Sequence, residues 1–370
     1  MKKRPGRTSR IFVLLLCFLL SICDINVTAA DKDDVKTVDL VAVGDDLIHT
    51  QIYKSCKTKK GYNFDSLFKH IKKDVKAADL AIINQETILV DKNYSGYPAF
   101  GSPKALANSI AKAGFNVVTH ATNHTLDRGT SAIKGTLKYW NTKHPDIKVL
   151  GIHKSKKDAG KITVVKKNGI KIAMLNYTYG LNGYRLPSDK SYMIDLLSNK
   201  SKIKKDIKKA KKKSDFVIVF AHFGTEYRHS PDSSQKKWAK FFANQGVDML
   251  IGTHPHVIEP YKMVKGKKGH KMLTYYSLGN FVSSQNRVPR LLGGMAKATI
   301  IKDKKGTRIK TYTMKPLVTH IEKNCKSYTV YKLSDYTAKL AKKNHIHRMS
   351  PGETFTVKKL KRLFKKITKK

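Results

Sequence analysis

Short apolar runs alternate with amphipathic stretches along most of the chain. The apolar runs have strand length and predict strands at residues 38–43, 80–84, 117–119, 149–151, 162–166, 170–177, 216–220, 249–252, 273–277, 298–302 and 308–314. Helical spacing of apolar positions predicts helices at residues 64–77, 104–113, 131–141, 202–212 and 234–244. Asn168-Gly169 between two predicted strands indicates a tight hairpin. This alternation predicts an α/β fold, and residues 38–316 contain no repeat or linker that would divide it.

The first thirty residues have the pattern of an export signal. A basic start precedes an apolar run at residues 11–22, which is short for a membrane span, and small residues follow at 28–30. The alternatives are an uncleaved membrane anchor and lipid modification at Cys23, which the bulky Ile22 disfavours. All three place the body of the protein, residues 31–330, outside the cytoplasm. Cys56 and Cys325 would then lie in a compartment that allows them to pair.

The last forty residues, 331–370, differ in composition and are predicted to form a basic helical tail. Eight of the fourteen residues from 357 to 370 are Lys or Arg, and an apolar stripe recurs among them at helical spacing. Such a helix is typical of a segment that lies on an anionic membrane surface. The alternatives are a helix whose stripe docks on the domain and a solvated tail.

The charge balance is strongly positive. Lys and Arg total 74 against 27 Asp and Glu, which gives a formal net charge of +47. A field of this sign favours anionic partners, although a Lys-rich, merely solvated surface is the alternative explanation. Because the body is predicted to be extracytoplasmic, the expected partners are an anionic polymer or a membrane surface, and nucleic acid is not expected.

Polar residues gather where predicted strands end. Five such loops contain Gly44-Asp45-Asp46, Asn84-Gln85-Glu86, the segment 120–127, the segment 221–226, and Gly252-Thr253-His254-Pro255-His256. In open α/β sheets the carboxyl ends of strands form the functional edge, so these five loops are expected to converge. Their side chains offer oxygen donors and imidazoles without thiolates. That set predicts a site for divalent Zn, Mn or Fe.

Six motifs along the chain resemble, in sequence and order, those of a known family. They are G-D-x-L at 44–47, N-x-E at 84–86, A-T-N-H-x-x-D at 121–127, H-x-G-x-E-Y at 222–227, G-T-H-P-H-V at 252–257 and Y-S-L-G-N-F at 276–281. Together they resemble the bacterial capsule-synthesis proteins of the CapA/PgsA type, which take part in poly-γ-glutamate synthesis. The resemblance covers residues 38–316. It implies a metallophosphoesterase-like sandwich with α/β/β/α layers and a metal site at the carboxyl edge of its strands.

The resemblance also implies roles for individual residues. The expected metal ligands are Asp45, Glu86, Asn123, His222, His254 and His256, with Glu86 between two metals. His124 would protonate a leaving group, with Asp127 as its partner. The residues expected to orient substrate or water are Asp46, Asn84, Glu226 and Asn280. As structural alternatives, Glu226 caps or pairs on the surface and Asn280 holds a turn.

Two positions depart from the phosphoesterase pattern. The first motif normally reads D-x-H, but Leu47 stands at its third position, where Asp46 or His49 are the substitutes at other spacings. The second motif offers Asn84 and Glu86 in place of Asp. The prediction is therefore one or two metal ions. Residues 176–184 contain several tyrosines, which are expected to pack in the core or at a rim rather than to wall the cleft.

The functional expectation is a membrane-associated, extracytoplasmic component of poly-γ-glutamate or related capsule synthesis and export. It would work with other membrane proteins of that system and handle an anionic substrate at a hydrolase-like metal site. The alternatives are a secreted phosphoesterase acting on nucleotides or cell-wall phosphodiesters, and a polymer-binding subunit without catalysis.

Overall fold

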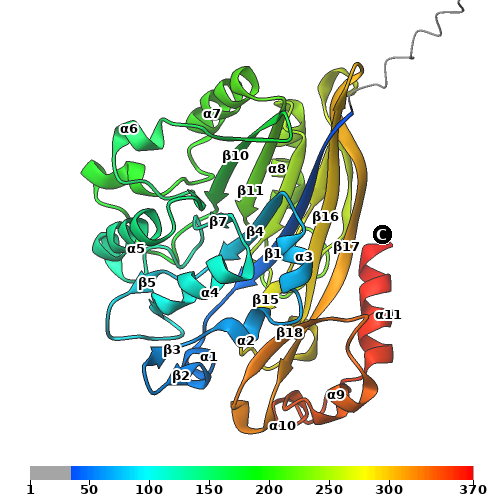
Figure 1. Cartoon of the computed structure of the whole chain (residues 1–370). Helices are drawn as coiled ribbons and strands as arrows, with labels where there is room; N and C mark the ends of the chain where they lie inside the picture. Colours follow the sequence, from blue (N-terminus) through cyan, green and yellow to red (C-terminus); the bar gives the residue numbers. More distant parts are fainter. Residues whose placement is uncertain (1–34, 370) are drawn as a thin grey trace, which may run out of the picture. The chain divides into compact units, whose positions relative to one another are not determined.

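A computed structural model describes residues 35–369, and these form one compact unit. The predicted export signal at residues 1–30 lies outside the described residues. Two large sheets and the helices around them make up the unit (Figure 1). Strand β1 (Lys36–Asp46) lies in the first sheet, and β10 (Ile170–Thr178) lies in the second.

The first sheet has eight strands, in the order β18-β17-β16-β1-β4-β7-β8, with β15 also paired to β1. The strands beside β1 are β4 (Leu80–Gln85), β7 (Val117–Thr119), β8 (Lys148–Leu150), β15 (Asn280–Val282), β16 (Leu292–Asp303), β17 (Gly306–Ile321) and β18 (Tyr328–Lys332). From β1 through β4 and β7 to β8 the pairing is parallel, whereas β16, β17 and β18 are antiparallel. The parallel part therefore brings its carboxyl ends to one edge.

The second sheet has six strands, in the order β13-β14-β12-β11-β10-β9. The strands beside β10 are β9 (Thr163–Lys167), β11 (Phe216–His222), β12 (Met249–Thr253), β13 (Tyr261–Lys265) and β14 (Lys271–Tyr275). The four inner strands are parallel, and the two edge strands are antiparallel. Asn168 and Gly169, with φ of 46° and 79°, join β9 to β10, which confirms the predicted hairpin.

The main core lies between the two sheets. Apolar side chains of β1, β4 and β16 pack there with those of β10, β11 and β12. On the side of the first sheet, this core also includes residues of α2 (Asp65–Phe68), α3 (Lys72–Lys76) and α4 (Ala105–Ala113). A second apolar cluster joins the second sheet to α7 (Lys200–Lys213) and α8 (Ser233–Asn244). The predicted α/β class with α/β/β/α layers is confirmed.

A smaller apolar cluster lies beside the parallel end of the first sheet. It contains buried residues of α5 (Gly129–Lys143), where a helix was predicted. The remaining short elements are α1 (Thr50–Ser55), β2 (Lys57–Thr58), β3 (Gly61–Tyr62), β5 (Leu89–Val90), β6 (Ser102–Pro103), α6 (Lys156–Ala159), η1 (Ser188–Met193), η2 (Lys267–Gly269), η3 (Val288–Leu291) and η4 (Lys323–Cys325).

The C-terminal segment packs on the body. Strand β18 crosses the predicted boundary at residue 330, and α9 (Ala338–Lys343), α10 (Ile346–Met349) and α11 (Val357–Thr368) follow. In α11, Leu360 and Ile367 are buried, and Val357, Leu363 and Phe364 pack partly buried against the same core. Figure 1 shows α11 lying alongside β17. Among residues 35–369, no helix combines the length and apolarity needed to cross a bilayer.

Some predicted elements differ from the structure. Two short helices, α2 and α3, stand in place of the single helix expected at 64–77. The chain turns between them, and Leu67, Phe68 and Ile71 are buried there. Strand β16 begins six residues earlier than predicted, at Leu292 rather than at residue 298. Its glycines lower the strand signal, yet Gly293 is required, because a Cβ there would meet the Asn280 carbonyl oxygen at 2.1 Å. Both cysteines of the described chain, Cys56 and Cys325, are free thiols.

Candidate metal centre

Five loops meet at one edge where the two sheets face each other. Asp45 is the last residue but one of β1, Glu86 follows β4, and Asn123 follows β7. From the second sheet, His222 ends β11, and His254 and His256 follow β12. All six predicted ligands are buried. The parallel strands explain the convergence, since their carboxyl ends point to the same side.

Glycines allow the backbones at this edge to approach one another. A Cβ at Gly44 would lie 1.8 Å from the Gly279 carbonyl oxygen, and one at Gly252 would lie 1.9 Å from the Tyr276 carbonyl oxygen. Both contacts are far inside van der Waals distance, so any larger residue would displace the backbone. The glycines that open the first and fifth motifs therefore set how closely the strands bearing Asp45 and His254 can pack.

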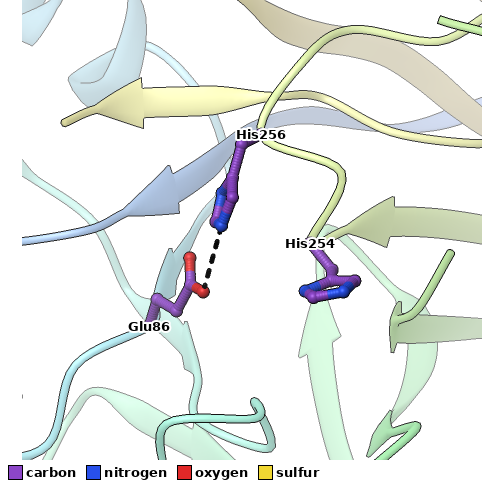
Figure 2. Close-up of side chains that lie close together, drawn as sticks. All are labelled: Glu86, His254 and His256. Atoms are coloured by element: carbon purple, nitrogen blue, oxygen red, sulfur yellow. Dashed lines mark ion pairs between the residues drawn. The ribbon is translucent and has the colours of Figure 1, made fainter. Parts of the chain in front are cut away.

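Glu86, His254 and His256 form the centre of the site (Figure 2). One donor atom of each lies within 4.8 Å of the other two. The Oε1 atom of Glu86 is 3.8 Å from Nε2 of His256, the ion pair drawn in Figure 2, and 3.6 Å from Nε2 of His222. Glu86 thus lies between imidazoles of two loops.

The remaining predicted ligands surround this centre. Asp45 contacts Nδ1 of His256 through Oδ2 at 3.1 Å. Asn123 Oδ1 contacts Nε2 of His222 at 2.8 Å. Nδ1 of His222 contacts the Thr253 hydroxyl at 3.0 Å, which fixes the imidazole ring from its other side.

Two of these histidines have a backbone conformation that is uncommon for residues with side chains. His254 has φ of 100° and His256 has φ of 59°. Such conformations cost free energy and concentrate at functional sites, where the surrounding structure enforces them. Here they turn both imidazoles of one short loop into the same cluster.

Burial sets the charge state of the cluster. It lowers the pKa of His222 and of His254 well below the ordinary value, and the neighbouring imidazoles lower both further. Both rings are therefore neutral, which is the form that binds a metal. Burial, and after it the negative charge of Asp45, raises the pKa of Glu86 well above its ordinary value. The pocket is thus short of positive charge.

Unsatisfied polar atoms mark the same place. Neither carboxylate oxygen of Glu86 accepts a hydrogen bond, and Nδ1 of His254 has no partner in the described chain. Buried polar atoms without partners are rare and costly. A divalent cation bound by carboxylate and imidazole donors would satisfy them, so the donor set fits the metal that the sequence predicts.

A histidine and carboxylate pair lies beside the cluster. Nδ1 of His124 is 2.7 Å from Oδ2 of Asp127, which also accepts the Phe100 backbone N–H at 2.8 Å. The contact with a carboxylate holds the hydrogen on Nδ1 and leaves Nε2 for proton exchange. The structure therefore brings together the two residues predicted to be catalytic.

The four residues predicted to orient substrate lie in different environments. Asn84 donates to Oδ1 of Asp45 at 2.9 Å and accepts from the Thr119 hydroxyl. It therefore holds the Asp45 carboxylate in place. Glu226 is exposed and lines the pocket. Asn280 is buried, and its amide nitrogen contacts the Arg290 carbonyl oxygen at 3.0 Å.

Asp46 is buried without any partner in residues 35–369. Neither of its carboxylate oxygens accepts a hydrogen bond, and burial raises its pKa to about 8. The chain at this point has an irregular register between Asp45 and Asp46, where β1 pairs with both β4 and β15.

A pocket of about 520 Å³ opens over the cluster. His124, His256 and Glu226 line it, together with His49, one of the two substitutes considered for the missing first-motif histidine. Burial lowers the pKa of His49 to about 4, so its ring is neutral. The sequence thus indicated His49, although its spacing does not match the motif.

The tyrosine-rich loop contributes more to the pocket than expected. Tyr177 is in the core, as predicted, but Asn182 and Tyr184 line the pocket. The Tyr179 ring lies 4.5 Å from that of His254. Asn182 contacts the Asn123 amide at 3.0 Å and Nδ1 of His124 at 3.2 Å. Its only signal in the sequence is a turn-forming Asn-Gly pair, which does not indicate what the turn will contact.

The model of the bacterial capsule synthesis protein family, PGA_cap, matches residues 39–285, which include all six motifs and all the residues of the centre. The chain belongs to the PGA_cap family. The predicted family is confirmed.

Two relatives of this PGA_cap chain have descriptive names. This chain is 30% identical over 290 residues to the PGA biosynthesis protein CapA of Bacillus subtilis (strain 168). The match covers 74% of this chain and 70% of that protein. The chain is 27% identical over 299 residues to the capsule biosynthesis protein CapA of Bacillus anthracis, which covers 77% and 70% respectively.

Solved structures with a similar arrangement are more distant. The calcineurin-like phosphoesterase YfkN from Bacillus subtilis has a TM-score of 0.49 and 12% identity, and the match covers 91% of this chain and 100% of that one. The putative 5′-nucleotidase from Staphylococcus aureus has a TM-score of 0.48 and 13% identity, with 75% and 54% covered.

Proposed function

We propose that this PGA_cap protein acts in poly-γ-glutamate or related capsule synthesis through a divalent-metal site that hydrolyses or holds an anionic substrate. The observation that carries this proposal is the Glu86 carboxylate, which is buried among imidazoles and accepts no hydrogen bond at either oxygen. A site of this composition supports cation binding better than it supports a purely structural role.

The residues divide into holding and proton-transfer roles. Asp45, Glu86, Asn123, His222, His254 and His256 would hold one or two ions of Mn, Zn or Fe. Such an ion supplies Lewis acidity and neutralises negative charge on the substrate. His124, fixed at Nδ1 by Asp127, supplies a proton from Nε2 to the departing atom.

The positive charge of the chain supports an anionic substrate. A net charge of +47 draws polyanions toward the surface and raises their local concentration at the pocket. We further propose that the protein works outside the cytoplasm at the membrane, beside other membrane proteins of capsule synthesis. The basic, then apolar pattern of residues 1–30 supports this placement.

The test combines metal content with substrate preference. The purified protein is compared with the His254→Ala/His256→Ala variant and with a control, His70→Ala/His347→Ala, which removes two histidines elsewhere. After incubation with manganese, zinc or iron, bound metal is measured by mass spectrometry. Release of glutamate from poly-γ-glutamate and of phosphate from a phosphodiester is then measured with each protein.

Metal bound by the protein and the control, but lost in the His254/His256 variant, together with glutamate release, would support the proposal. Phosphate release alone would favour a secreted phosphoesterase. Equal metal in all three proteins would refute the site. Polymer binding without metal or turnover would indicate a binding subunit.

A further inference from the structure

Helix α11 docks its apolar stripe on the body, which is one of the alternatives that its sequence left open, and exposes its cations. Its apolar stripe is covered, because Leu360 and Ile367 are buried against the body and the rest of the stripe is partly buried. Between Val357 and Thr368 the chain has no acidic residue. The exposed side chains of the helix are its cations, which are Lys358, Lys359, Lys361, Arg362, Lys365 and Lys366.

A groove of about 540 Å³ runs between α11 and η3. Val288, Pro289 and Leu363 give it apolar walls, and four of the α11 cations line it, namely Lys358, Lys359, Arg362 and Lys366. None of these four forms an ion pair with residues 35–369. Their charges are therefore available to a ligand.

The carboxylate that lines this groove does not neutralise the cations of α11. Glu353 contacts the Arg287 guanidinium at 3.2 Å, accepts the Val288 backbone N–H at 3.0 Å and accepts the Ser350 hydroxyl at 2.9 Å. These contacts engage both of its oxygens. The groove consequently combines apolar walls with uncompensated positive charge, a combination that strengthens the local field.

Helix η3 links the groove to the metal-site pocket. The Arg290 guanidinium of η3 lies 3.6 Å from the centre of the Tyr227 ring, and Tyr227 lines the pocket. Asn280, which starts β15 beside Asp45, holds the Arg290 carbonyl. On the other side, Lys366 is close enough to His229 to act on it electrostatically. Arg290 therefore connects Tyr227 of the pocket with Val288 and Pro289 of the groove.

We propose that α11 and η3 form a cationic track that binds the part of an anionic polymer extending beyond the metal-site pocket. This inference rests on the proposed function, since it assumes a polyanionic substrate. A helix of 12 residues is about 18 Å long, so several charges of an extended chain can be met along it. Binding there releases counterions and holds the polymer while one segment occupies the pocket.

The geometry of the track suits an extended polymer better than a membrane surface. A helix that lies in a bilayer interface needs a free apolar face to insert, and the apolar face of α11 is packed on the body. A groove with walls also fits a single extended chain more closely than it fits a plane of headgroups.

The experiment compares the unmodified protein with two charge-reversal variants of the whole chain. Lys359→Glu/Arg362→Glu/Lys366→Glu changes the track, and Lys204→Glu/Lys208→Glu/Lys212→Glu changes three exposed lysines of α7 by the same total charge. Fluorescence anisotropy measures binding of labelled long poly-γ-glutamate and of a labelled γ-glutamate trimer at low and high salt. Bound metal and sedimentation with phosphatidylglycerol vesicles are measured for each protein.

The track variant is expected to bind the long polymer at least about tenfold more weakly than the α7 variant at low salt, since each basic residue near an anionic surface contributes about a fivefold factor and three are reversed. Trimer binding should change less, and bound metal should stay the same in all three proteins. Equal loss in the two variants would overturn the inference and indicate only a general charge effect. Vesicle binding that depends on the track, with polymer binding that does not, would overturn it in favour of a membrane surface. Both results leave the metal site, which is scored separately by metal content, intact.

Discussion

Replacing Glu86 by Gln is the sharpest test of why this carboxylate is buried. In the metal-free protein it is 1% exposed, accepts no hydrogen bond and lies near the negative charge of Asp45. A buried polar group without partners costs about 1–3 kcal/mol, and a charged one costs more. Gln keeps the shape and the unpaired polar atoms but cannot ionise, so it removes only the additional cost of the carboxylate charge, or of the proton that this group takes up because its pKa is raised. Metal-free Glu86→Gln is therefore expected to be more stable than the unmodified protein by about 1–3 kcal/mol.

Metal should reverse that order. An ion at 100 times its dissociation constant stabilises the folded state by about 2.7 kcal/mol. The Gln variant has lost a ligand that lies between two imidazoles, so it should gain much less. The unmodified protein is then expected to be the more stable of the two when metal is present.

Urea unfolding followed by circular dichroism, with EDTA or with manganese, measures both effects. Glu226→Gln is the matched control, because Glu226 lines the same pocket but is exposed. Its unfolding curve should be unchanged in EDTA. The reasoning is refuted if metal-free Glu86→Gln is less stable than the unmodified protein, or if manganese stabilises both proteins equally.

Three further outcomes are expected. His124→Ala should lower any hydrolytic rate by roughly 10²–10⁴-fold, and Asp127→Asn should lower it by roughly 10–100-fold. Initial rates with metal-loaded protein measure both effects. An unaltered rate would remove the residue concerned from the mechanism. Burial raises the pKa of Asp248 from 3.8 to about 6, so its contribution to stability is present below about pH 4 and lost as the pH rises to about 6. At 1.36 kcal/mol per pKa unit the loss is about 3 kcal/mol, and unfolding free energies of Asp248→Asn across this range should lack it; a parallel pH profile would contradict the assignment. Leu360→Ala should destabilise the protein by about 2–5 kcal/mol in urea, and a change well below 1 kcal/mol would mean that α11 does not pack on the body.

The strand pattern of the sequence was reliable where local signals were consistent. The buried parallel strands β4, β7, β11 and β12 read as continuous apolar runs and were predicted within two residues of their ends. Strands β13 and β18 were not predicted, because each has only five residues with polar residues among the apolar ones, and no residue of β13 is buried. Their existence depends on neighbouring strands that offer unpaired backbone groups.

The site shows the same division. The ordered motifs identified Asp45, Glu86, Asn123, His222, His254 and His256, and the structure brings all six together. Asn182 was not identified, since it comes from a turn 59 residues after Asn123 and contacts it only in the folded chain. A turn signal describes local backbone geometry and carries no information about a distant partner.

Helix α11 shows most clearly which properties are local to the sequence and which depend on the tertiary structure. Its sequence determined an amphipathic helix with a cationic face, because apolar spacing and charge are local properties. Whether the apolar stripe would meet lipid, solvent or protein depended on a surface that is built from β17, β18 and residues far away along the chain. The sequence alone thus determined the family, the layered α/β class and the chemistry available at the strand ends. Only the tertiary structure decided which side chains share a pocket and which face of α11 stays exposed, since both depend on packing between segments that are remote in sequence.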